Sequence, residues 1–354
     1  MTFYQRVFHR PFFIRLFNWE YWSFGAIYAC IYPIYFALCL RNRSLFFFAA
    51  ANPRIRNGGF LCESKKDIAA LIPAAYHPRS LFIDLPADPD KAVQELSAAG
   101  LLFPLIGKPN MGGRGRGISM LRDEQAVRRY VARAQMDFHI QEFIVYPNEA
   151  GIFYCRYPGE AKGKITGIVQ KLFLTVKGDG RNTMRQLLQQ DRRSIMYLAG
   201  LDKLMGAQLD TVLPAGEERI LSPYGNHARG AKFLDHTHLV DETLTASIDA
   251  VCRQIPEFYY GRLDIRYRSW EELRQGRHFT IIEVNGAGAE PTHMYDPKHS
   301  LFFAWKEIVR HWFILATISR LNHRKGHRYL SFKEGLAMFR EDKEWSRRLE
   351  AMGE

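Results

Sequence analysis

Two segments in the C-terminal half carry charged and amide residues at alternate positions. Arg262 and Asp264 lie in YGRLDIRY, and Glu283 and Asn285 lie in FTIIEVN. Alternate residues of a strand point to the same face, so each pair shares a face. Two carboxylates and an amide oxygen suit Mg²⁺, and Arg262 is placed to neutralise charge on a phosphoryl group or an oxyanion. The alternative is a solvated edge strand with surface charges.

A glycine-rich loop follows Gly107-Lys108-Pro109. It reads NMGGRGRG and contains Gly112, Gly113, Gly115 and Gly117. Without Cβ atoms, its backbone N–H groups can close around phosphate oxygens, and Lys108 supplies a fixed cation. The loop matches neither the GxxxxGK[ST] pattern nor a dinucleotide fingerprint, so a surface turn remains the alternative.

Mixed helical and strand patterns surround these residues. Periodicity and turn signals predict helices over 64–75, 89–99 and 124–135. They predict strands over 80–85, 102–108, 138–145, 151–156, 165–176, 260–267 and 279–284. We therefore expect an α/β chain of the α+β type, with the glycine loop after one strand and the carboxylates on two others.

Composition narrows the class of protein. The 354 residues are 47% apolar, which excludes a disordered or fibrous chain, and the net charge of +12 favours a polyanionic partner. Charge alone also suggests a nucleic-acid binder, but the aromatic residues cluster near the N-terminus rather than among the basic residues of the loop and the tail. The five cysteines form no CxxC pair, so we expect reduced thiols and no structural metal site.

The region 21–40 contains no charged residue. As one helix it would extend ~30 Å, the thickness of a bilayer core. Pro33 interrupts it and arginines flank both ends, which favours a surface-lying or re-entrant helix, with Tyr28, Tyr32 and Tyr35 on one face at the headgroup boundary. A buried helix of a soluble domain and a cleaved signal peptide ending near Ala49–Ala51 are the alternatives.

In this order the motifs resemble the ATP-grasp superfamily, and within it the D-alanine:D-alanine ligases. The similarity covers roughly 58–297, and the segment 178–183 is similar to one in cyanophycin synthetases. The motifs that carry it are Ser64-Lys65, Gly107-Lys108-Pro109 with its loop, Gln141-Glu142-Phe143-Ile144, Arg262-x-Asp264 and Glu283-x-Asn285.

The resemblance implies two α+β subdomains that grip ATP. It implies an apolar N-terminal segment over 1–57, the first ATP-grasp subdomains with the loop over 58–135, the catalytic subdomain over 136–321 and a basic tail over 322–354. Such enzymes phosphorylate a carboxylate with ATP, and an amine then attacks the acyl phosphate to give an amide and ADP. ATP and two Mg²⁺ ions, with Mn²⁺ as a substitute, are the implied cofactors.

The resemblance also implies roles for individual residues. Lys65, Lys108 and the loop glycines Gly112, Gly113, Gly115 and Gly117 would hold the phosphates. Gln141, Glu142, Phe143 and Ile144 would bind adenine, and Glu149 would hold the ribose. Asp264, Glu283 and Asn285 would ligate the metal ions. Lys171 would approach the γ-phosphate and Arg262 would stabilise the tetrahedral intermediate.

Some residues keep two interpretations. Asn226 and Arg229, with His227 between them, are expected at the γ-phosphate or the acceptor, with an ordinary loop as the alternative. His293 is either an acceptor base or, more commonly, a surface-loop histidine.

The sequence departs from the family at its N-terminus. Fifty-seven residues precede the similarity, where such ligases carry a domain of about a hundred residues. Arg114 and Arg116 stand where D-alanine ligases carry serines. We therefore do not transfer D-alanine as the substrate.

We expect a carboxylate–amine ligase held peripherally or monotopically at the cytoplasmic face of the inner membrane. It would act on a small or amphiphilic carboxylate and an amine, next to an anionic membrane surface and without nucleic acid. The alternative is a degenerate ATP-binding sensor or scaffold.

Overall fold

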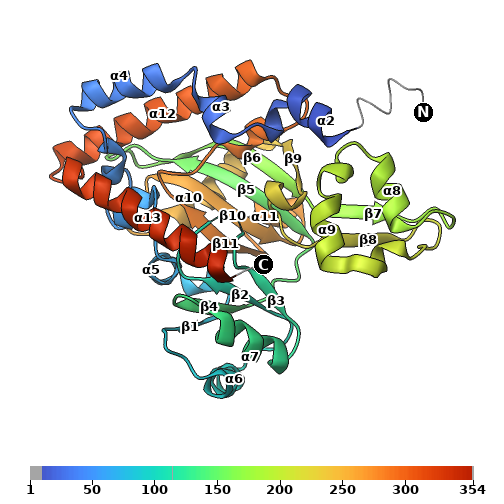
Figure 1. Cartoon of the computed structure of the whole chain (residues 1–354). Coiled ribbons are helices and arrows are strands. Elements are labelled where there is room, and N and C mark those ends of the chain that lie inside the picture. The colour runs from blue at the N-terminus through green and yellow to red at the C-terminus, as the bar shows by residue number, and fades with distance from the viewer. Residues whose placement is uncertain (1–9, 114, 353–354) are drawn as a thin grey trace.

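The computed structural model describes residues 10–113 and 115–352 (Figure 1). In this part of the chain the strands form antiparallel sheets of five, four and two strands. Helices cover the sheets and are interspersed with the strands along the chain. The α+β class expected from the sequence is confirmed, and the two larger sheets correspond to the two subdomains that the ATP-grasp resemblance implies.

The five-stranded sheet has the order β11-β10-β5-β6-β9. Its strands are β5 (Asn148–Cys155), β6 (Lys164–Leu172), β9 (Lys232–Asp235), β10 (Tyr260–Tyr267) and β11 (Phe279–Asn285). One face carries apolar residues at alternate positions, such as Ile152, Leu263 and Ile281, in a core shared with α5 (Lys65–Leu71), α10 (Glu242–Cys252) and α11 (Trp270–Arg274). The other face is left for polar side chains.

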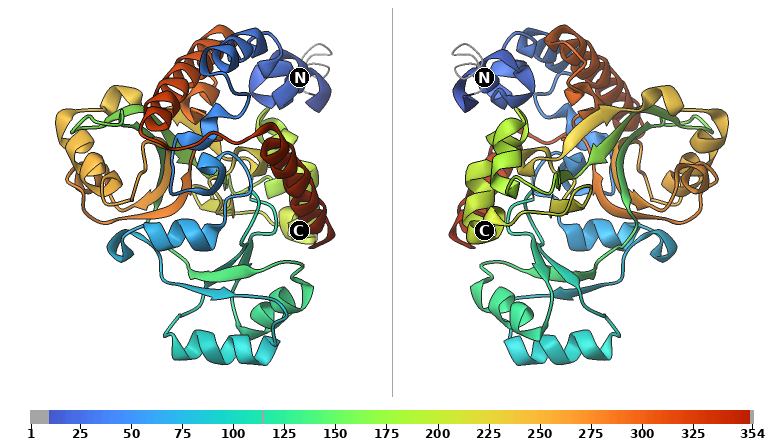
Figure 2. Two further views of the ribbon diagram at one scale, coloured as in Figure 1. Left: turned by 90° about the vertical axis from the view of Figure 1, so that its left-hand side faces the viewer. Right: turned by 90° about the vertical axis from the view of Figure 1, so that its right-hand side faces the viewer.

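The four-stranded sheet has the order β1-β4-β2-β3. It is formed by β1 (Ser80–Ile83), β2 (Leu105–Pro109), β3 (Ser119–Leu121) and β4 (Phe138–Glu142) and packs on α6 (Pro89–Ala98) and α7 (Glu124–Arg133). The side chains of Asp88 and Asp123 cap these two helices. Figure 2 shows this unit at the opposite end of the molecule from the N-terminal segment.

The third sheet belongs to a small unit of its own. It pairs β7 (Leu174–Lys177) with β8 (Glu218–Ser222) and shares a core with α8 (Met184–Gln190), α9 (Leu198–Met205), η5 (Ser194–Met196) and η6 (Gly206–Asp210). Asp179 accepts hydrogen bonds from the backbone N–H groups of Arg181 and Asn182, and Thr183 begins α8 with a capping box. The segment 178–183 is thus the turn that leads into a helix.

Single 3₁₀ turns connect the larger elements. They are η4 (Ala74–Tyr76), η7 (His227–Arg229), η8 (Thr237–Leu239) and η9 (Thr292–Tyr295).

The N-terminal segment is broken into short helices. These are α2 (Pro11–Phe17), η1 (Trp19–Tyr21), α3 (Phe24–Tyr28), α4 (Tyr32–Asn42), η2 (Phe47–Ala50) and η3 (Arg56–Gly59), and residues 1–9 lie outside the described chain. Ser23 caps α3, and Pro33 lies in the first turn of α4. Within the described residues, every helix is too short or too polar to cross a membrane.

The predicted outward face of three tyrosines is wrong. Tyr28 ends α3 and Tyr32 begins α4, so the tyrosines do not share one continuous helix. Tyr28 is buried, and its hydroxyl donates to Glu290 Oε1 at 2.6 Å, while Tyr35 packs against Trp312. The tyrosines therefore face the protein, because their hydroxyl groups and rings find partners there.

Buried polar contacts join the N-terminal segment to the five-stranded sheet. Asn52 donates to the carbonyls of Gly58 and Tyr260 and accepts from the backbone N–H groups of Tyr259 and Tyr260. The backbone of Gly58 and Gly59 accepts hydrogen bonds from Ala287 and Gly288, directly after β11. A Cβ atom on Gly59, whose φ is +77°, would lie 2.7 Å from Gly286 Cα, so only glycine fits.

Two long helices complete the chain. Helix α12 (Leu301–Arg324) packs on η2 and α4, and the region expected as a basic tail contains α13 (Phe332–Met352). Met338 of α13 lies in the core with the N-terminal segment, and Leu349 lies in the core of the four-stranded sheet. Helix α13 thus connects the two ends of the molecule (Figure 1); residues 353–354 lie outside the described chain.

Candidate active site

A cavity of about 630 Å³ lies between the two larger sheets. Its walls come from strands β2, β4, β5, β6, β10 and β11, from the loop before η7 and from the N-terminal segment. We call this cavity the cleft. Most of the residues predicted from the sequence line it: Lys108, Gly113, Gly115, Gln141, Glu142, Phe143, Ile144, Glu149, Lys171, Asn226, Arg262, Asp264, Glu283 and Asn285.

The floor of the cleft is the polar face of the five-stranded sheet. In the register of β10 and β11, Asp264 lies opposite Glu283 and Arg262 lies opposite Asn285. Directly opposed residues have Cβ atoms about 5 Å apart. The two segments singled out in the sequence are thus adjacent strands whose polar residues face the same cavity.

Asp264 is held by two cations at the centre of this floor. Arg262 donates to both of its carboxylate oxygens, at 2.8 and 3.1 Å, and Lys171 Nζ lies 3.3 Å from Oδ2. Burial by itself would raise the pKa of Asp264, but Arg262 and Lys171 outweigh it and lower that pKa to about 2. Asp264 is therefore ionised at neutral pH.

Glu149 occupies a similar position next to it. Its carboxylate accepts from Lys171 at 3.1 Å and from Arg266 at 3.0 Å, and its side chain is buried. Burial lowers the pKa of Lys171, yet Asp264 and Glu149 outweigh this and raise it. Opposite charges thus alternate across the sheet in a fixed arrangement that can stabilise a polyphosphate and a metal ion together.

Gly151 provides the space for this arrangement. Gly151 lies on β5, opposite Asp264 of β10 and opposite Val169 of β6. A Cβ atom there would lie 3.0 Å from both Arg262 Cδ and Asp264 Oδ1. The missing side chain lets the Arg262–Asp264 pair lie flat on the sheet.

Lys108 faces this floor from the four-stranded sheet. Its Nζ donates to Gln141 Oε1 at 2.7 Å and reaches the carbonyl of Ile282 at 3.5 Å, so it bridges the two sheets. Burial lowers the pKa of Lys108 to about 8, with Glu283 acting in the opposite direction. A phosphate group would restore a full counter-charge to this amine.

The end of β4 forms the next part of the wall. Gln141 lies on the strand, while Phe143 and Ile144 follow it and line the cleft. Glu142 is fixed at its rim by Arg79, whose Nε donates to Oε2 at 3.2 Å. The assignment of adenine to residues 141–144 stays a prediction.

The glycines of the loop have two different positions: some line the cleft, and others pack against neighbouring residues outside it. Gly113 and Gly115 line the cleft, whereas Gly112 packs closely against Leu349 and Gly117 against Pro109. Lys65 lies outside the cleft wall and donates to the carbonyl of Gly112 at 2.6 Å. Lys65 and these two glycines therefore position the loop. Arg114 lies outside the described residues.

The loop before η7 covers the cleft from the side of the third sheet. Asn226 lines the cleft and caps η7, accepting from the N–H of Ala228. Arg229 lies outside the cleft wall, with its guanidinium 4.8 Å from the centre of the Tyr224 ring. Gly225 packs closely against the carboxylate of Glu149, so a Cβ at Gly225 would clash with that carboxylate.

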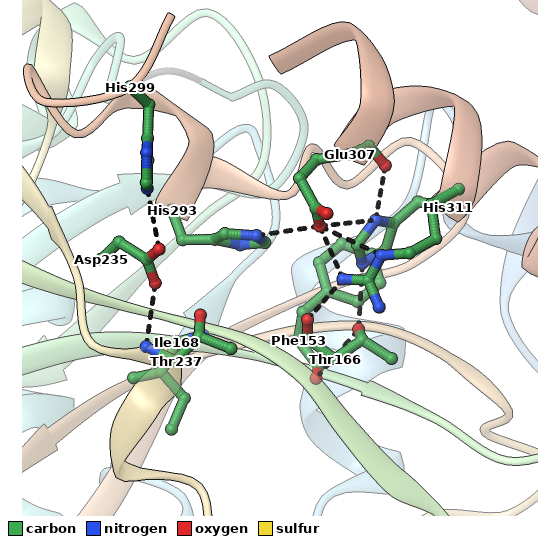
Figure 3. A network of polar contacts seen from close by, with 10 residues as sticks. Phe153, Thr166, Ile168, Asp235, Thr237, His293, His299, Glu307 and His311 are labelled. Carbon is green, nitrogen blue, oxygen red and sulfur yellow. Dashed lines mark hydrogen bonds and ion pairs between the residues drawn. The ribbon is translucent and has the colours of Figure 1, made fainter. Parts of the chain in front are cut away.

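Neither interpretation of His293 agrees with the structure. Its side chain is 3% exposed and does not line the cleft. Its Nε2 lies 3.1 Å from Glu307 Oε2, in a network that includes Arg310, His311 and Thr166 (Figure 3). His293 is a core residue that joins η9 to α12 over Gly167, where a Cβ would clash with its ring.

The sequence analysis missed several residues of the cleft. Arg266 continues the alternation of Arg262 and Asp264, so its position could have been inferred from strand periodicity. Glu20, Trp22 and Phe24 line the far end of the cleft together with Glu290, and no local pattern indicates this. Glu20 is the one acidic residue among the first 57, which is the only signal available for it.

The donor set fits a hard divalent cation. Asp264, Glu283 and Asn285 present oxygen atoms on adjacent strands, as Mg²⁺ requires. The side chain of Glu283 makes no hydrogen bond or ion pair with residues 10–113 and 115–352, and Glu283 lines the cleft. No group of three or more His, Cys, Asp and Glu residues that could hold a metal ion is found in the described chain.

Comparisons with known proteins find similarity in structure alone. No protein-family model and no curated protein matches the sequence. A bifunctional glutathione synthetase from Pasteurella multocida has 13% identity and a TM-score of 0.39, covering 70% of this chain and 36% of the synthetase. A D-Ala:D-Ser ligase from Enterococcus faecalis has 14% identity and a TM-score of 0.40, covering 71% of this chain and 62% of the ligase.

A D-alanine–D-alanine ligase from Bacillus anthracis gives a similar result. It has 12% identity and a TM-score of 0.39, and the alignment covers 74% of this chain and 67% of the ligase. This is the type of enzyme that the sequence motifs resemble. The chain thus spans about a third of the synthetase and less than two thirds of the D-Ala:D-Ser ligase.

Proposed function

We propose that the protein is an ATP-dependent ligase of the ATP-grasp type, which joins a carboxylate to an amine and releases ADP and phosphate. The observation that carries the proposal is the charged floor of the cleft, where Lys171 and Arg262 enclose Asp264. Lys108 faces it from the opposite sheet. Transfer of a phosphoryl group to a carboxylate brings two anions together, and such a site offsets their repulsion.

ATP would lie between the two sheets. Its adenine would contact the backbone of 141–144, and its ribose would lie near Glu149. Its phosphates would extend between Lys108 and the cleft-lining glycines Gly113 and Gly115. Lys65, Gly112 and Gly117 support the loop from outside, so their contribution to ATP binding is positional.

Asp264, Glu283 and Asn285 would hold Mg²⁺ beside the phosphates. The bound ion would withdraw electrons from the phosphoryl group and neutralise its charge. Asn226 and Arg229 lie on the loop that covers this region, and we assign to that loop the exclusion of water from the reactive acyl phosphate. The protein itself need not supply a nucleophile.

The proposed reaction proceeds in two steps. A carboxylate oxygen forms a bond to the γ-phosphorus as the bond to ADP breaks, which gives an acyl phosphate. The uncharged amine then adds to the acyl carbon, the C–O bond to phosphate breaks, and the amine proton leaves. Arg262 lies beside the acyl group and stabilises the negative oxygen of the tetrahedral intermediate, while Lys171 neutralises the transferred phosphoryl group.

The test is ADP release from MgATP in the presence of hydroxylamine, which traps an acyl phosphate as a hydroxamate. We would screen amino acids, short peptides and amphiphilic carboxylates. At least one carboxylate should raise ADP and hydroxamate formation together, and Asp264→Asn should lower both by about a hundredfold or more. The exposed Glu217→Gln, which loses an ion pair with Arg219, is the matched control.

A degenerate ATP-binding sensor is the second candidate. It predicts ATP binding by calorimetry with no stimulated ADP release across the panel. Undiminished turnover in Asp264→Asn would contradict the assignment of the metal site but not that of a ligase.

We also propose that the N-terminal segment attaches the protein peripherally to an anionic membrane, on its cytoplasmic face. Large apolar side chains are exposed on α2 and α4, including Phe12, Phe36 and Leu40, and Arg15 and Arg41 are exposed beside them. Exposed apolar residues next to arginines are typical of interfacial helices.

Co-sedimentation with phosphatidylserine vesicles tests the attachment. The double variant Phe36→Glu/Leu40→Glu should lower vesicle binding about tenfold or more, because both apolar contacts are lost and two anions are added. Leu102→Glu, at an equally exposed leucine of the four-stranded unit, is the control and should bind as the wild type does. Equal binding by all three proteins would contradict the proposal.

A further inference from the structure

One end of the cleft is built by residues that the proposed chemistry does not use. Glu20, Trp22 and Phe24 enter it from the N-terminal segment, and Glu290 and Tyr295 enter it from the region after β11. This end lies beyond Arg262 from the position proposed for adenine. We leave this end to the second substrate of the proposed reaction.

Glu290 is a carboxylate of this end, and the nearby charge of Arg262 attracts it. Its Oε1 accepts hydrogen bonds from Tyr28 at 2.6 Å and from Tyr295 at 3.2 Å. No ion pair joins its side chain to a residue in the described part of the chain. Glu20, in contrast, forms an ion pair with Arg193 at 2.8 Å, and its Oε2 also lies 2.9 Å from His227 Nε2.

Glu290 lies next to the reacting groups. Its backbone carbonyl accepts a hydrogen bond from Arg262 at 3.1 Å, so the residue that would stabilise the intermediate and Glu290 are in direct contact. The side chain of Glu290 is half-buried and lines the cleft. A cation bound there would lie near the acyl group held by Arg262.

The rim of this end is aromatic. Phe24 stacks on Tyr28 with ring centres 3.9 Å apart, and the indole of Trp22 is fixed by hydrogen bonds to the carbonyls of Arg15 and Leu16. Trp22 and Phe24 remain 37% and 44% exposed. They form a preformed apolar surface near a carboxylate that makes no ion pair with the described residues.

We infer that this end of the cleft binds the amine substrate as a primary ammonium carried on an apolar chain. The ammonium group would bind Glu290 and the chain would lie on Trp22 and Phe24. The carboxylate of Glu290 would then accept one proton from the ammonium, which leaves the uncharged amine that attacks the acyl carbon. The inference rests on the proposed function, because it assigns the amine of the ligase reaction to a site. Neither Glu290 nor the N-terminal aromatic residues follow from the ATP-grasp motifs.

The experiment is calorimetric titration of the full-length protein, loaded with Mg²⁺ and a non-hydrolysable ATP analogue. The probes are n-octylamine, n-octanol, octanoate and ethylamine. Octylamine should bind most tightly, since octanol lacks the charge, octanoate has the opposite charge and ethylamine lacks the chain. Glu290→Gln should weaken octylamine binding about tenfold or more, whereas Glu217→Gln should leave it unchanged.

Two results would overturn the inference. One is equal octylamine affinity in the wild type and Glu290→Gln, and the other is tighter binding of octanoate than of octylamine. Should Glu290→Gln fail to fold, Tyr295→Phe, which removes one hydroxyl from Glu290, replaces it and should weaken octylamine about threefold or more. Ethylamine binding as tightly as octylamine would also contradict the assigned apolar chain.

The readout separates this inference from the proposed function. Octylamine binding is measured without turnover, whereas the ligase proposal depends on hydroxamate formed from ATP. Hydroxamate formation with no effect of Glu290→Gln on octylamine would refute the subsite alone. Octylamine binding at Glu290 without hydroxamate from any carboxylate would refute the ligase alone.

Discussion

Gly151→Ala should inactivate the site, because the added methyl group would displace the side chains of Arg262 and Asp264. The added Cβ would lie 2.9 Å from Val169 Cγ1, and 3.0 Å from Arg262 Cδ and Asp264 Oδ1, whereas ordinary contacts begin at 3.4 Å. The neighbours must therefore move by 0.4 to 0.5 Å. Displacements of this order cost about tenfold to a hundredfold in rate when they affect groups that orient a reaction.

The stability cost should be smaller than the loss of activity. Overpacking by one methyl group costs about 1–3 kcal/mol. ATP affinity should change less than threefold, because Lys108 and residues 141–144 lie on the other sheet. We would measure the free energy of unfolding in urea, the Kd for MgATP and the rate of ADP release.

A matched glycine controls for the extra methyl group. Gly200 lies in α9, and a Cβ there would meet nothing within 4 Å. Gly200→Ala should raise the free energy of unfolding by about 0.5–1 kcal/mol and leave turnover unchanged. Wild-type turnover in Gly151→Ala would refute the conclusion that the Arg262–Asp264 geometry depends on the space at Gly151.

Four further predictions concern the charge and the connections of the site. Because burial lowers the pKa of Lys108 to about 8, the amine loses its charge above that pH; ATP affinity, measured by calorimetry, should fall from pH 7 to 9 in the wild type and change less in Lys108→Met. The same shift should make the Lys108 contribution to stability rise with pH between about 8 and 10.5, since the unfolded chain then binds more protons. Glu283→Gln should raise the Mg²⁺ concentration needed for half-maximal ADP release about tenfold, and an unchanged requirement would remove Glu283 from the metal site. Asn52→Ala should lower the free energy of unfolding by about 2–4 kcal/mol in urea, since it removes the acceptor of the backbone N–H groups of Tyr259 and Tyr260; a loss below about 0.5 kcal/mol would contradict that role.

Strand periodicity predicted the floor of the cleft well, because it is a local property. The segment 260–267 is β10 as predicted, and β11 extends one residue beyond the predicted end at 284. Alternation then placed Arg262 with Asp264 and Glu283 with Asn285, and the antiparallel pairing made them neighbours. The predicted strand over 165–176 is instead two strands, β6 and β7, which belong to different sheets.

The N-terminal segment could not be predicted in the same way. An uncharged run is compatible with a membrane helix, a buried helix and several short helices, and the choice depends on distant partners. Here Trp305 donates to the carbonyl of Ile27, and Glu290 accepts from Tyr28. These partners lie more than 260 residues away in sequence, so no local pattern contains the information.

His293 illustrates the same limit for a single residue. Its neighbours in sequence suggested a loop, and its type suggested a base. Its actual environment is set by Glu307 on α12 and by the absence of a side chain at Gly167. The subdomain boundaries at 57, 135 and 321 and the individual roles of the cleft residues stay predictions.

The most direct test of the central claim follows the oxygen atoms of the carboxylate. The carboxylate that the hydroxamate screen identifies would be labelled with ¹⁸O and incubated with MgATP and its amine, and the released phosphate would be analysed by mass spectrometry. An acyl-phosphate ligase transfers one ¹⁸O atom to each phosphate and releases ADP. Phosphate without ¹⁸O, or release of AMP and pyrophosphate, would contradict the account.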